Sequence, residues 1–344
     1  MAPKDITDAL RQVRYPGTGQ DIVSAGMVED DITVKGFRVT FSLIFKKDND
    51  PFRKSLLKAC EAAIKTFVNS EAEVVIHEKM PTVRSEEDTW HNPNKLGKII
   101  AVSSGKGGVG KSTVTSNLAV SLAALGYRVG LLDADIFGPS QPRMFGVEGY
   151  RPVAEEVDGR NLIVPVEKFG VKMLSIGFFV DVTNAIIWRG AMASNAIKQL
   201  INEAMWGELD YFLIDLPPGT SDIHLTVVQT LSLSGALVVT TPQPVALADA
   251  RRGVDMFRND KIGVPVLGII ENMSWFTPAE LPSNRYYIFG KDGGKTLAEE
   301  MQVPLLGQIP LVQSVREGAD NGVPVALQAG HPAAEEYRKI AERL

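Results

Sequence analysis

The chain has 344 residues, of which 22% are charged and 44% hydrophobic, and its formal net charge is −5. This length predicts about two domains, because single cores seldom grow beyond ~250–300 residues, and the composition is typical of a soluble globular protein. The acidic balance disfavours a general nucleic-acid binder, and no run approaches the ~18 apolar residues that a membrane span needs. We therefore expect a cytoplasmic protein that binds neither nucleic acid nor membrane.

Residues 1–80 predict a small α+β domain that carries no nucleotide-binding signal. Apolar residues alternate over 37–45, which is the period of a strand with one buried face, and a hairpin turn at 35–36 precedes it. Apolar residues then recur at helical spacing over 52–67, and 73–77 supply a further strand.

Cysteine and histidine usage gives no sign of a metal or redox site built on thiolates or imidazoles within one chain. Cys60 is the only cysteine, so neither an internal disulfide nor a Cys-x-x-Cys site can form. It lies on the apolar stripe of the helix expected over 52–67, and we predict a buried structural thiol. The histidines lack metal-ligand spacing, and we expect surface or packing roles for His77, His91, His224 and His331.

The rest of the chain predicts a linker and a larger α/β domain. Residues 81–96 are polar, charged and proline-bearing, as linkers are, and the larger domain is expected over 97–344. Apolar runs alternate there with helical segments, and we expect strands at 98–103, 127–132, 211–214, 236–239, 266–270 and 304–309. Continuous apolar strands separated by helices predict a mainly parallel sheet with helices on both faces, and a ligand at the carboxyl ends of the strands.

A glycine-rich segment after the strand at 98–103 fits the pattern G-x-x-x-x-G-K-[ST]. It predicts nucleoside triphosphate binding by Gly105, Lys106, Gly107, Gly108, Val109, Gly110, Lys111, Ser112 and Thr113. In this pattern the glycines let the backbone wrap the phosphates, Lys111 reaches the β- and γ-phosphates, and the hydroxyl of Ser112 ligates Mg²⁺. A helix over 112–125 would direct its N-terminus at the anion. A glycine-rich turn without a ligand is the alternative.

Carboxylates end two of the predicted strands and complete a candidate NTPase site. Asp215 ends the strand at 211–214, where a carboxylate is the expected Mg²⁺ partner in a phosphate-loop protein. Asp133 and Asp135 follow the strand at 127–132, and Asp135 is the candidate for activating the attacking water. A helix N-cap for Asp215, and a cap or turn role for Asp133 and Asp135, stay open as alternatives.

Together, five motifs resemble the Mrp/ApbC family of iron-sulfur carrier ATPases, which belong with MinD and ParA among the deviant Walker-A NTPases. The motifs are GKGGVGKST, DADIFGPS, WRGAM, WGELDYFLIDLPPGTSD and ENMSWF. The resemblance covers essentially the whole chain, including a small N-terminal domain like that of bacterial Mrp proteins. It implies a P-loop NTPase fold of the deviant Walker-A type and Mg²⁺-dependent hydrolysis of ATP.

The resemblance also implies a homodimer that sandwiches two ATP molecules, in which Lys106 reaches the partner's nucleotide. Lys106 then joins Lys111 and Asp135 as a catalytic residue, with a solvated surface lysine as the alternative. By the same likeness Asn272 contacts the base, and Pro310 and Leu311 line the adenine pocket. Met273 and Trp275 occupy the Lys and Asp positions of the guanine-selective pattern Asn-Lys-x-Asp, so adenine is favoured.

The chain departs from the family at the cluster ligands. Most members carry a Cys-x-x-Cys pair shortly after the segment that matches 271–276, and here residues 277–285 contain no cysteine. Because thiolates are the usual ligands, the standard bridging cluster cannot form, and no iron-sulfur ligands are identifiable.

Two functions follow as hypotheses. The first is ATP-driven assembly or transfer of iron-sulfur clusters, with scaffold or apo-client proteins as partners and with the cluster contact supplied by a partner or by weaker ligands. The second is a cluster-free, ATP-switched positioning protein of MinD/ParA character. A membrane anchor of the MinD kind would need a basic amphipathic C-terminal helix. Residues 333–344 have mixed charge and predict a packing helix instead.

Overall fold

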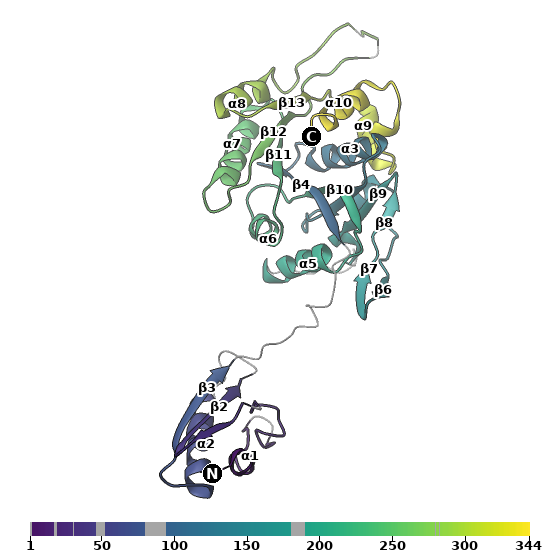
Figure 1. Ribbon diagram of the computed structural model, residues 1–344. Coiled ribbons are helices and arrows are strands. Elements are labelled where there is room, and N and C mark those ends of the chain that lie inside the picture. Colours follow the sequence, from purple (N-terminus) through teal and green to yellow (C-terminus); the bar gives the residue numbers. More distant parts are fainter. Residues whose placement is uncertain are drawn as a thin grey trace. The chain divides into compact units, whose positions relative to one another are not determined.

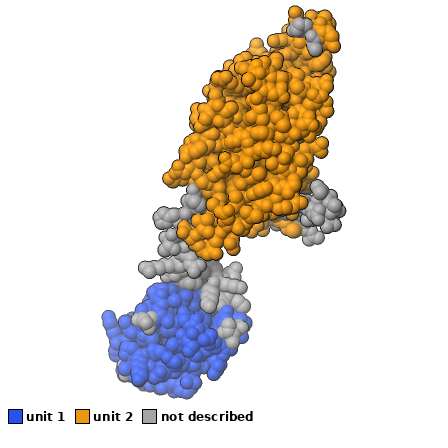
Figure 2. All heavy atoms as spheres, turned by 90° about the vertical axis from the view of Figure 1, so that its right-hand side faces the viewer, with its two compact units in different colours: residues 1–91 blue, residues 92–344 orange. Residues whose placement is uncertain are grey.

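The computed structural model describes residues 2–16, 19–29, 31–45, 52–79, 94–179, 190–278, 280–281 and 283–344. The chain divides into two compact units, Met1–His91 and Asn92–Leu344 (Figure 2), each with its own buried core. The linker predicted at 81–96 lies largely outside the described residues. Strand β4 begins at Lys95, slightly before the domain start predicted at residue 97.

Unit 1 is a three-stranded sheet with two helices (Figure 1). Its elements are α1 Pro3–Leu10, β1 Thr33–Lys35, β2 Arg38–Ile44, α2 Arg53–Phe67 and β3 Glu73–Lys79. The central strand β2 runs antiparallel to β1 and parallel to β3. The small α+β N-terminal domain expected from the sequence is therefore confirmed.

The core of unit 1 follows the predicted strand period, with one exception. Val39, Phe41 and Leu43 on β2 are fully buried, as the alternation predicts. Phe37 was expected on the same face, but it lies in the turn before β2 and is 58% exposed. Cys60 on α2 is buried as predicted, and this burial raises the pKa of its thiol to about 12.

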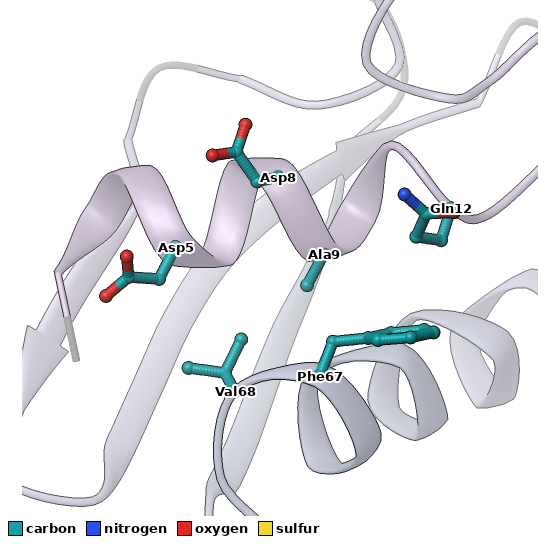
Figure 3. A pocket seen from close by; sticks show the side chains of 6 residues that line it. All are labelled: Asp5, Asp8, Ala9, Gln12, Phe67 and Val68. Carbon is teal, nitrogen blue, oxygen red and sulfur yellow. The ribbon is translucent and has the colours of Figure 1, made fainter.

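A shallow cavity of about 410 Å³ lies between α1 and the end of α2 in unit 1 (Figure 3). It is lined by Asp5, Asp8, Ala9, Gln12, Phe67 and Val68. The methyl group of Ala9 points toward the end of α2, where Phe67 is 64% exposed. No residue of the predicted nucleotide site lies in this cavity.

Unit 2 is built on an eight-stranded sheet in the order β13-β12-β11-β4-β10-β5-β9-β8. The bounds are β4 Lys95–Ser104, β5 Val129–Asp133, β8 Val166–Lys168, β9 Val171–Ser175, β10 Glu208–Asp215, β11 Gly235–Thr240, β12 Val266–Glu271 and β13 Leu305–Gln308. All neighbouring pairs are parallel except β8 and β9. A separate hairpin joins β6 Ala154–Val157 to β7 Arg160–Ile163.

Helices cover both faces of this sheet, as predicted (Figure 1). They are α3 Lys111–Ala124, α4 Gln141–Met144, α5 Gly190–Asn202, α6 Asp222–Thr230, α7 Pro244–Arg258, α8 Gly293–Met301, α9 Gln313–Asp320 and α10 Pro332–Ala341. Helices α3 and α10 pack together, and α5, α6, α7 and α8 lie on the opposite face (Figure 1). The packing role predicted for the C-terminal helix is confirmed, because Tyr337 and Ile340 of α10 are fully buried.

The strand register fixes where the functional loops meet. Asp215 at the end of β10 pairs with Val102 of β4 on one side and with Asp133 of β5 on the other. The loops that follow these strands therefore converge at one edge of the sheet, where ligands bind in parallel α/β folds. In the part of the chain that the structure describes, no helix is long and apolar enough to cross a membrane.

Candidate functional site

The loop between β4 and α3 has a backbone that demands glycine at particular positions. Gly108 and Gly110 have φ angles of +83° and +82°, a region that side chains disfavour. A Cβ at Gly105 would fall on the backbone of Asp249 in α7, and a Cβ at Gly110 would fall on the side-chain amide of Asn272. The loop ends at Lys111, where α3 begins and its first backbone amides lack partners within the helix. This is the geometry of a phosphate-binding loop.

Lys111 brings the predicted site residues together. Its side chain is 6% exposed, and its Nζ lies 2.5 Å from Oδ1 of Asp215 and 3.2 Å from Oγ of Ser112. The same Nζ lies 3.9 Å from Oδ2 of Asp135. The two carboxylates and the hydroxyl that the sequence singled out therefore surround one buried ammonium group.

Asp215 is completely buried and is held by partners that sequence reasoning missed. Thr115 donates from Oγ1 to its Oδ1 at 3.2 Å, and Gln141 donates from Nε2 to its Oδ2 at 2.8 Å. The same Nε2 of Gln141 also reaches the backbone oxygen of Ser112 at 3.0 Å. Gln141 therefore joins the carboxylate at the end of β10 to the start of α3. Its only sequence signal was its place a few residues after Asp135.

Burial shifts the pKa values of the two carboxyls after β5. Asp133 is fully buried, and this burial together with the nearby Asp215 raises its pKa to about 7. Burial also raises the pKa of Asp135, whose Oδ1 has no hydrogen-bond partner among the described residues. A carboxylate with a raised pKa and an unpaired oxygen is suited to accept a proton, and the role assigned to Asp135 stays a prediction.

A cavity of about 270 Å³ adjoins the loop and contains the residues predicted to hold the base. Asn272, Pro310 and Leu311 line it together with Gly110 and Thr113. Asn272 donates from Nδ2 to the backbone oxygen of Val109 at 2.9 Å, so the end of β12 is tied to the loop. The structure thus brings these residues together, and their contact with adenine stays a prediction.

Lys106 lies half-buried in the loop. Its backbone oxygen accepts a hydrogen bond from Oγ of Ser104 at 3.0 Å. Within the described residues, its ammonium makes no ion pair, in contrast to the buried ammonium of Lys111. Its role toward a second subunit is a prediction.

The cluster ligands that the sequence lacks are not replaced elsewhere in the described residues. No group of three or more His, Cys, Asp or Glu side chains there could hold a metal ion. In the segment that would carry the cysteines, Arg285 lies over the ring of Trp275 at 4.3 Å from its centroid.

The histidines have the surface and packing roles predicted for them, as far as the structure describes them. His224 is 1% exposed, and its burial lowers its pKa to about 4. His331 caps α10 by accepting from the backbone N–H of Ala333, and His77 is exposed on β3. His91 lies outside the described residues, as do Trp188 and Arg189 of the WRGAM motif.

A parallel sheet with a glycine-rich loop between β4 and α3, and a buried carboxylate at the end of β10, defines a P-loop NTPase. A family model described as the NUBPL iron-transfer P-loop NTPase matches residues 95–344. A second, described as an iron-sulfur cluster assembly protein, matches residues 3–75. The chain belongs to the family of iron-sulfur carrier P-loop NTPases.

One of the relatives matches almost the whole chain, and another matches about three quarters of it. The chain is 42% identical to the iron-sulfur cluster carrier protein of Synechocystis sp., covering 98% of this chain and 96% of that protein. It is 48% identical to the protein of the same name from Escherichia coli, covering 73% of this chain and 67% of that protein.

Solved structures match a large part of the chain. A nucleotide-binding protein of Archaeoglobus fulgidus in complex with ADP has a TM-score of 0.59 and 38% identity, covering 69% of this chain and 91% of that chain. The septum site-determining protein MinD of Pyrococcus horikoshii, complexed with Mg-ADP, has a TM-score of 0.54 and 26% identity, covering 72% of this chain and 95% of that chain. These neighbours confirm the MinD-like fold of the NTPase unit.

Proposed function

We propose that this protein is a Mg²⁺-dependent ATPase that acts in the assembly of iron-sulfur clusters or in their transfer to apoproteins. One observation carries the ATPase part of this proposal. Lys111, Ser112, Asp135 and Asp215 meet at the end of a glycine-rich loop with the backbone of a phosphate cradle. The family membership carries the iron-sulfur part.

Nucleotide binding exchanges the partner of Lys111. In the structure the ammonium of Lys111 is neutralised by the buried carboxylate of Asp215. A triphosphate held by the loop amides presents more negative charge, so Lys111 moves its hydrogen bonds to the β- and γ-phosphates. This exchange removes the ammonium from Oδ1 of Asp215, which keeps only its hydrogen bond from Thr115, while Oδ2 stays held by Gln141.

The residues around Lys111 fit a magnesium ion. The hydroxyl of Ser112 and the carboxylate of Asp215 both contact the Lys111 ammonium, and hydroxyl and carboxylate oxygens are the donors that Mg²⁺ prefers. When bound, the ion would neutralise charge on the transferred phosphoryl group.

Asp135 is the proposed base for the attacking water. As the water oxygen forms its bond to the γ-phosphorus and the bond to the β-phosphate oxygen breaks, a carboxylate oxygen of Asp135 accepts the proton of that water. The raised pKa of Asp135 makes it a stronger base than an exposed aspartate. Lys106 of the partner subunit would stabilise charge on the leaving oxygen, in a cytoplasmic homodimer. Asn272, Pro310 and Leu311 would hold the adenine.

The iron-sulfur cluster is cargo in this proposal, and the described residues do not fit a cluster held by thiolates. The only cysteine is Cys60 in unit 1, whose thiol is buried and has a pKa raised to about 12. Cluster ligation is therefore assigned to the scaffold or client protein, and nucleotide-dependent contact with those partners is the contribution of this chain.

A reconstituted transfer assay tests the proposal. The chain is mixed with a cluster-loaded scaffold protein and an apo-ferredoxin under anaerobic conditions, and visible circular dichroism follows cluster formation on the ferredoxin. We expect Mg²⁺-ATP to accelerate transfer in the presence of the wild type and not of Lys111→Ala. ATP hydrolysis without any effect on transfer would contradict the iron-sulfur part and favour an ATP-switched positioning protein.

A further inference from the structure

We propose that Asp133 is a positioning residue, whose buried carboxylate fixes the turn between β5 and α4 so that Asp135 and Gln141 reach the reaction centre. This inference rests on the proposed ATPase function of the same site and deepens it. The sequence pattern left Asp133 with a cap or turn role and gave it no part in the chemistry.

The carboxylate of Asp133 accepts hydrogen bonds from both ends of this turn. Its Oδ1 accepts from the backbone N–H of Asp135 at 3.2 Å, and its Oδ2 accepts from the backbone N–H of Gln141 at 3.1 Å. A third donor, Oγ of Ser175 on β9, reaches Oδ2 at 2.9 Å. All of these contacts are buried, and Asp133 itself has no exposed surface.

The neighbouring strand holds the turn from the other side. Ser175 pairs with Asp133 in the register of β5 and β9, and its Oγ also accepts from the backbone N–H of Gly177 at 3.0 Å. A Cβ at Gly177 would lie 2.9 Å from Pro139, so the backbone that follows β9 lies directly against the turn. Hydrogen bonds to Asp133 therefore hold the turn on one side, and the backbone that follows β9 packs against its other side.

The two residues whose amides Asp133 binds are those that reach the reaction centre. Asp135 places its carboxylate beside Lys111, and Gln141 donates to Asp215 and to the backbone of Ser112. Within the described residues, no hydrogen bond or ion pair joins Asp133 to Lys111. Its effect on the chemistry is therefore exerted through Asp135 and Gln141.

The substitution Asp133→Asn isolates this role, because it keeps the size of the side chain. An asparagine has one acceptor oxygen, whereas Asp133 uses both oxygens to accept backbone N–H groups, at Asp135 and at Gln141. Whichever way the amide is oriented, its NH₂ group faces one backbone donor, which loses its partner. Ser175→Ala is the milder second variant, since it removes one donor and leaves both backbone hydrogen bonds.

The test compares these variants with Asp210→Asn. Asp210 lies at the opposite end of β10 and pairs with Arg128 at the surface, so this control removes a strand-end carboxylate away from the site. Amide hydrogen exchange over residues 134–141 is measured without nucleotide, together with ATP affinity, kcat and the thermal midpoint.

We expect Asp133→Asn to speed exchange over 134–141 by about tenfold or more and to lower kcat by roughly 10- to 100-fold, as a misplaced catalytic group does. ATP affinity should stay within about threefold, because the loop amides and Lys111 do not contact Asp133. Ser175→Ala should also speed exchange over 134–141 and lower kcat, each by a smaller factor. This variant keeps the test decisive if Asp133→Asn does not fold. Asp210→Asn should change neither.

Unchanged exchange over 134–141 in the folded variants would overturn the inference, as would a loss of kcat matched by an equal loss of ATP affinity. The exchange measurement does not depend on catalysis. If the wild type hydrolyses no ATP, the proposed function fails, and the exchange data still decide whether Asp133 holds the turn.

Discussion

At the scale of single residues, the pair of Lys111 and Asp215 is the central feature of the site. The Lys111 side chain is 6% exposed and that of Asp215 is fully buried, so each charge has lost its hydration and depends on the other. We expect this ion pair to separate only when another anion, held nearby by other groups, replaces Asp215 as the partner of Lys111. The loop amides at the start of α3 are such groups, which couples the release of Asp215 to the arrival of a triphosphate.

Replacing Asp135 tests the proposed base directly. We expect Asp135→Asn to reduce kcat by about 10²–10⁴-fold, because an amide cannot accept the proton of the attacking water. ATP binding should persist, since Lys111 keeps its ammonium and the loop is intact. Single-turnover hydrolysis and equilibrium binding measure the two effects, and a full hydrolysis rate in the variant would remove Asp135 from the mechanism.

The sequence predicted the chemically distinctive residues at this scale and missed those that act through geometry. Lys111, Ser112 and Asp215 belong to a spaced motif or end an apolar strand, so their positions alone indicated their roles. Gln141 gave no such signal, because a buried glutamine resembles a solvent-exposed one until the fold places it against Asp215. Contacts between segments that are far apart in the sequence cannot be predicted from the local spacing of residue types.

At the scale of elements, the start of α6 contains a buried histidine that makes stability depend on pH. His224 is buried in the neutral form, and its Nδ1 accepts from the backbone N–H of Ser221 at 3.1 Å. Burial lowers its pKa from 6.5 to about 4. Between these values the unfolded chain binds a proton that the folded protein does not, so stability falls as the pH falls.

We expect the free energy of unfolding to drop by about 2 kcal/mol between pH 7.5 and pH 5 through His224, from this pKa difference. The variant His224→Gln should lose this part of the pH dependence, because glutamine does not titrate. Urea unfolding of both proteins at the two pH values measures the difference. An equal loss of stability in the wild type and the variant would show that His224 is not responsible.

The sequence predicted the strands of the large sheet from β13 to β5 and missed those at the other edge, β9 and β8. Strands β4, β5, β10 and β11 are continuous apolar runs because both faces of the sheet are covered, and this pattern is easily detected. The short strands β6 to β9 were not predicted. Strands β6, β7 and β8 are only partly buried and have short apolar runs or none. Strand β9 is largely buried, but Lys172 interrupts its short apolar run.

At the scale of the whole molecule, the proposed homodimer gives Lys106 a role that a single chain cannot show. We expect Lys106→Ala to keep ATP binding and to lose turnover by roughly 10³–10⁵-fold, as removal of an arginine finger does in other NTPases. Lys95→Ala is the control, because Lys95 is an exposed lysine paired with Glu208. Hydrolysis is measured over a range of protein concentrations, and a wild-type rate per subunit independent of concentration would contradict the role in trans.

Two units with separate cores and a single buried cysteine fit the proposal that this chain supplies the nucleotide site and that another protein supplies the cluster ligands. The sequence alone indicated this combination, because the number of cysteines does not depend on the fold. Which surface of the chain meets a partner depends on exposed side chains that are brought together only by folding, and no sequence pattern indicated it.

The central claim is that the loop from Gly105 to Thr113 holds a triphosphate through Lys111. Hydrolysis of ATP by the wild type and by Lys111→Ala, with circular dichroism to verify folding, tests this claim most directly. The account predicts Mg²⁺-dependent hydrolysis by the wild type and a rate at background for the variant, because backbone amides alone poorly offset the charge of a triphosphate. Undiminished hydrolysis by a folded Lys111→Ala protein would contradict the account.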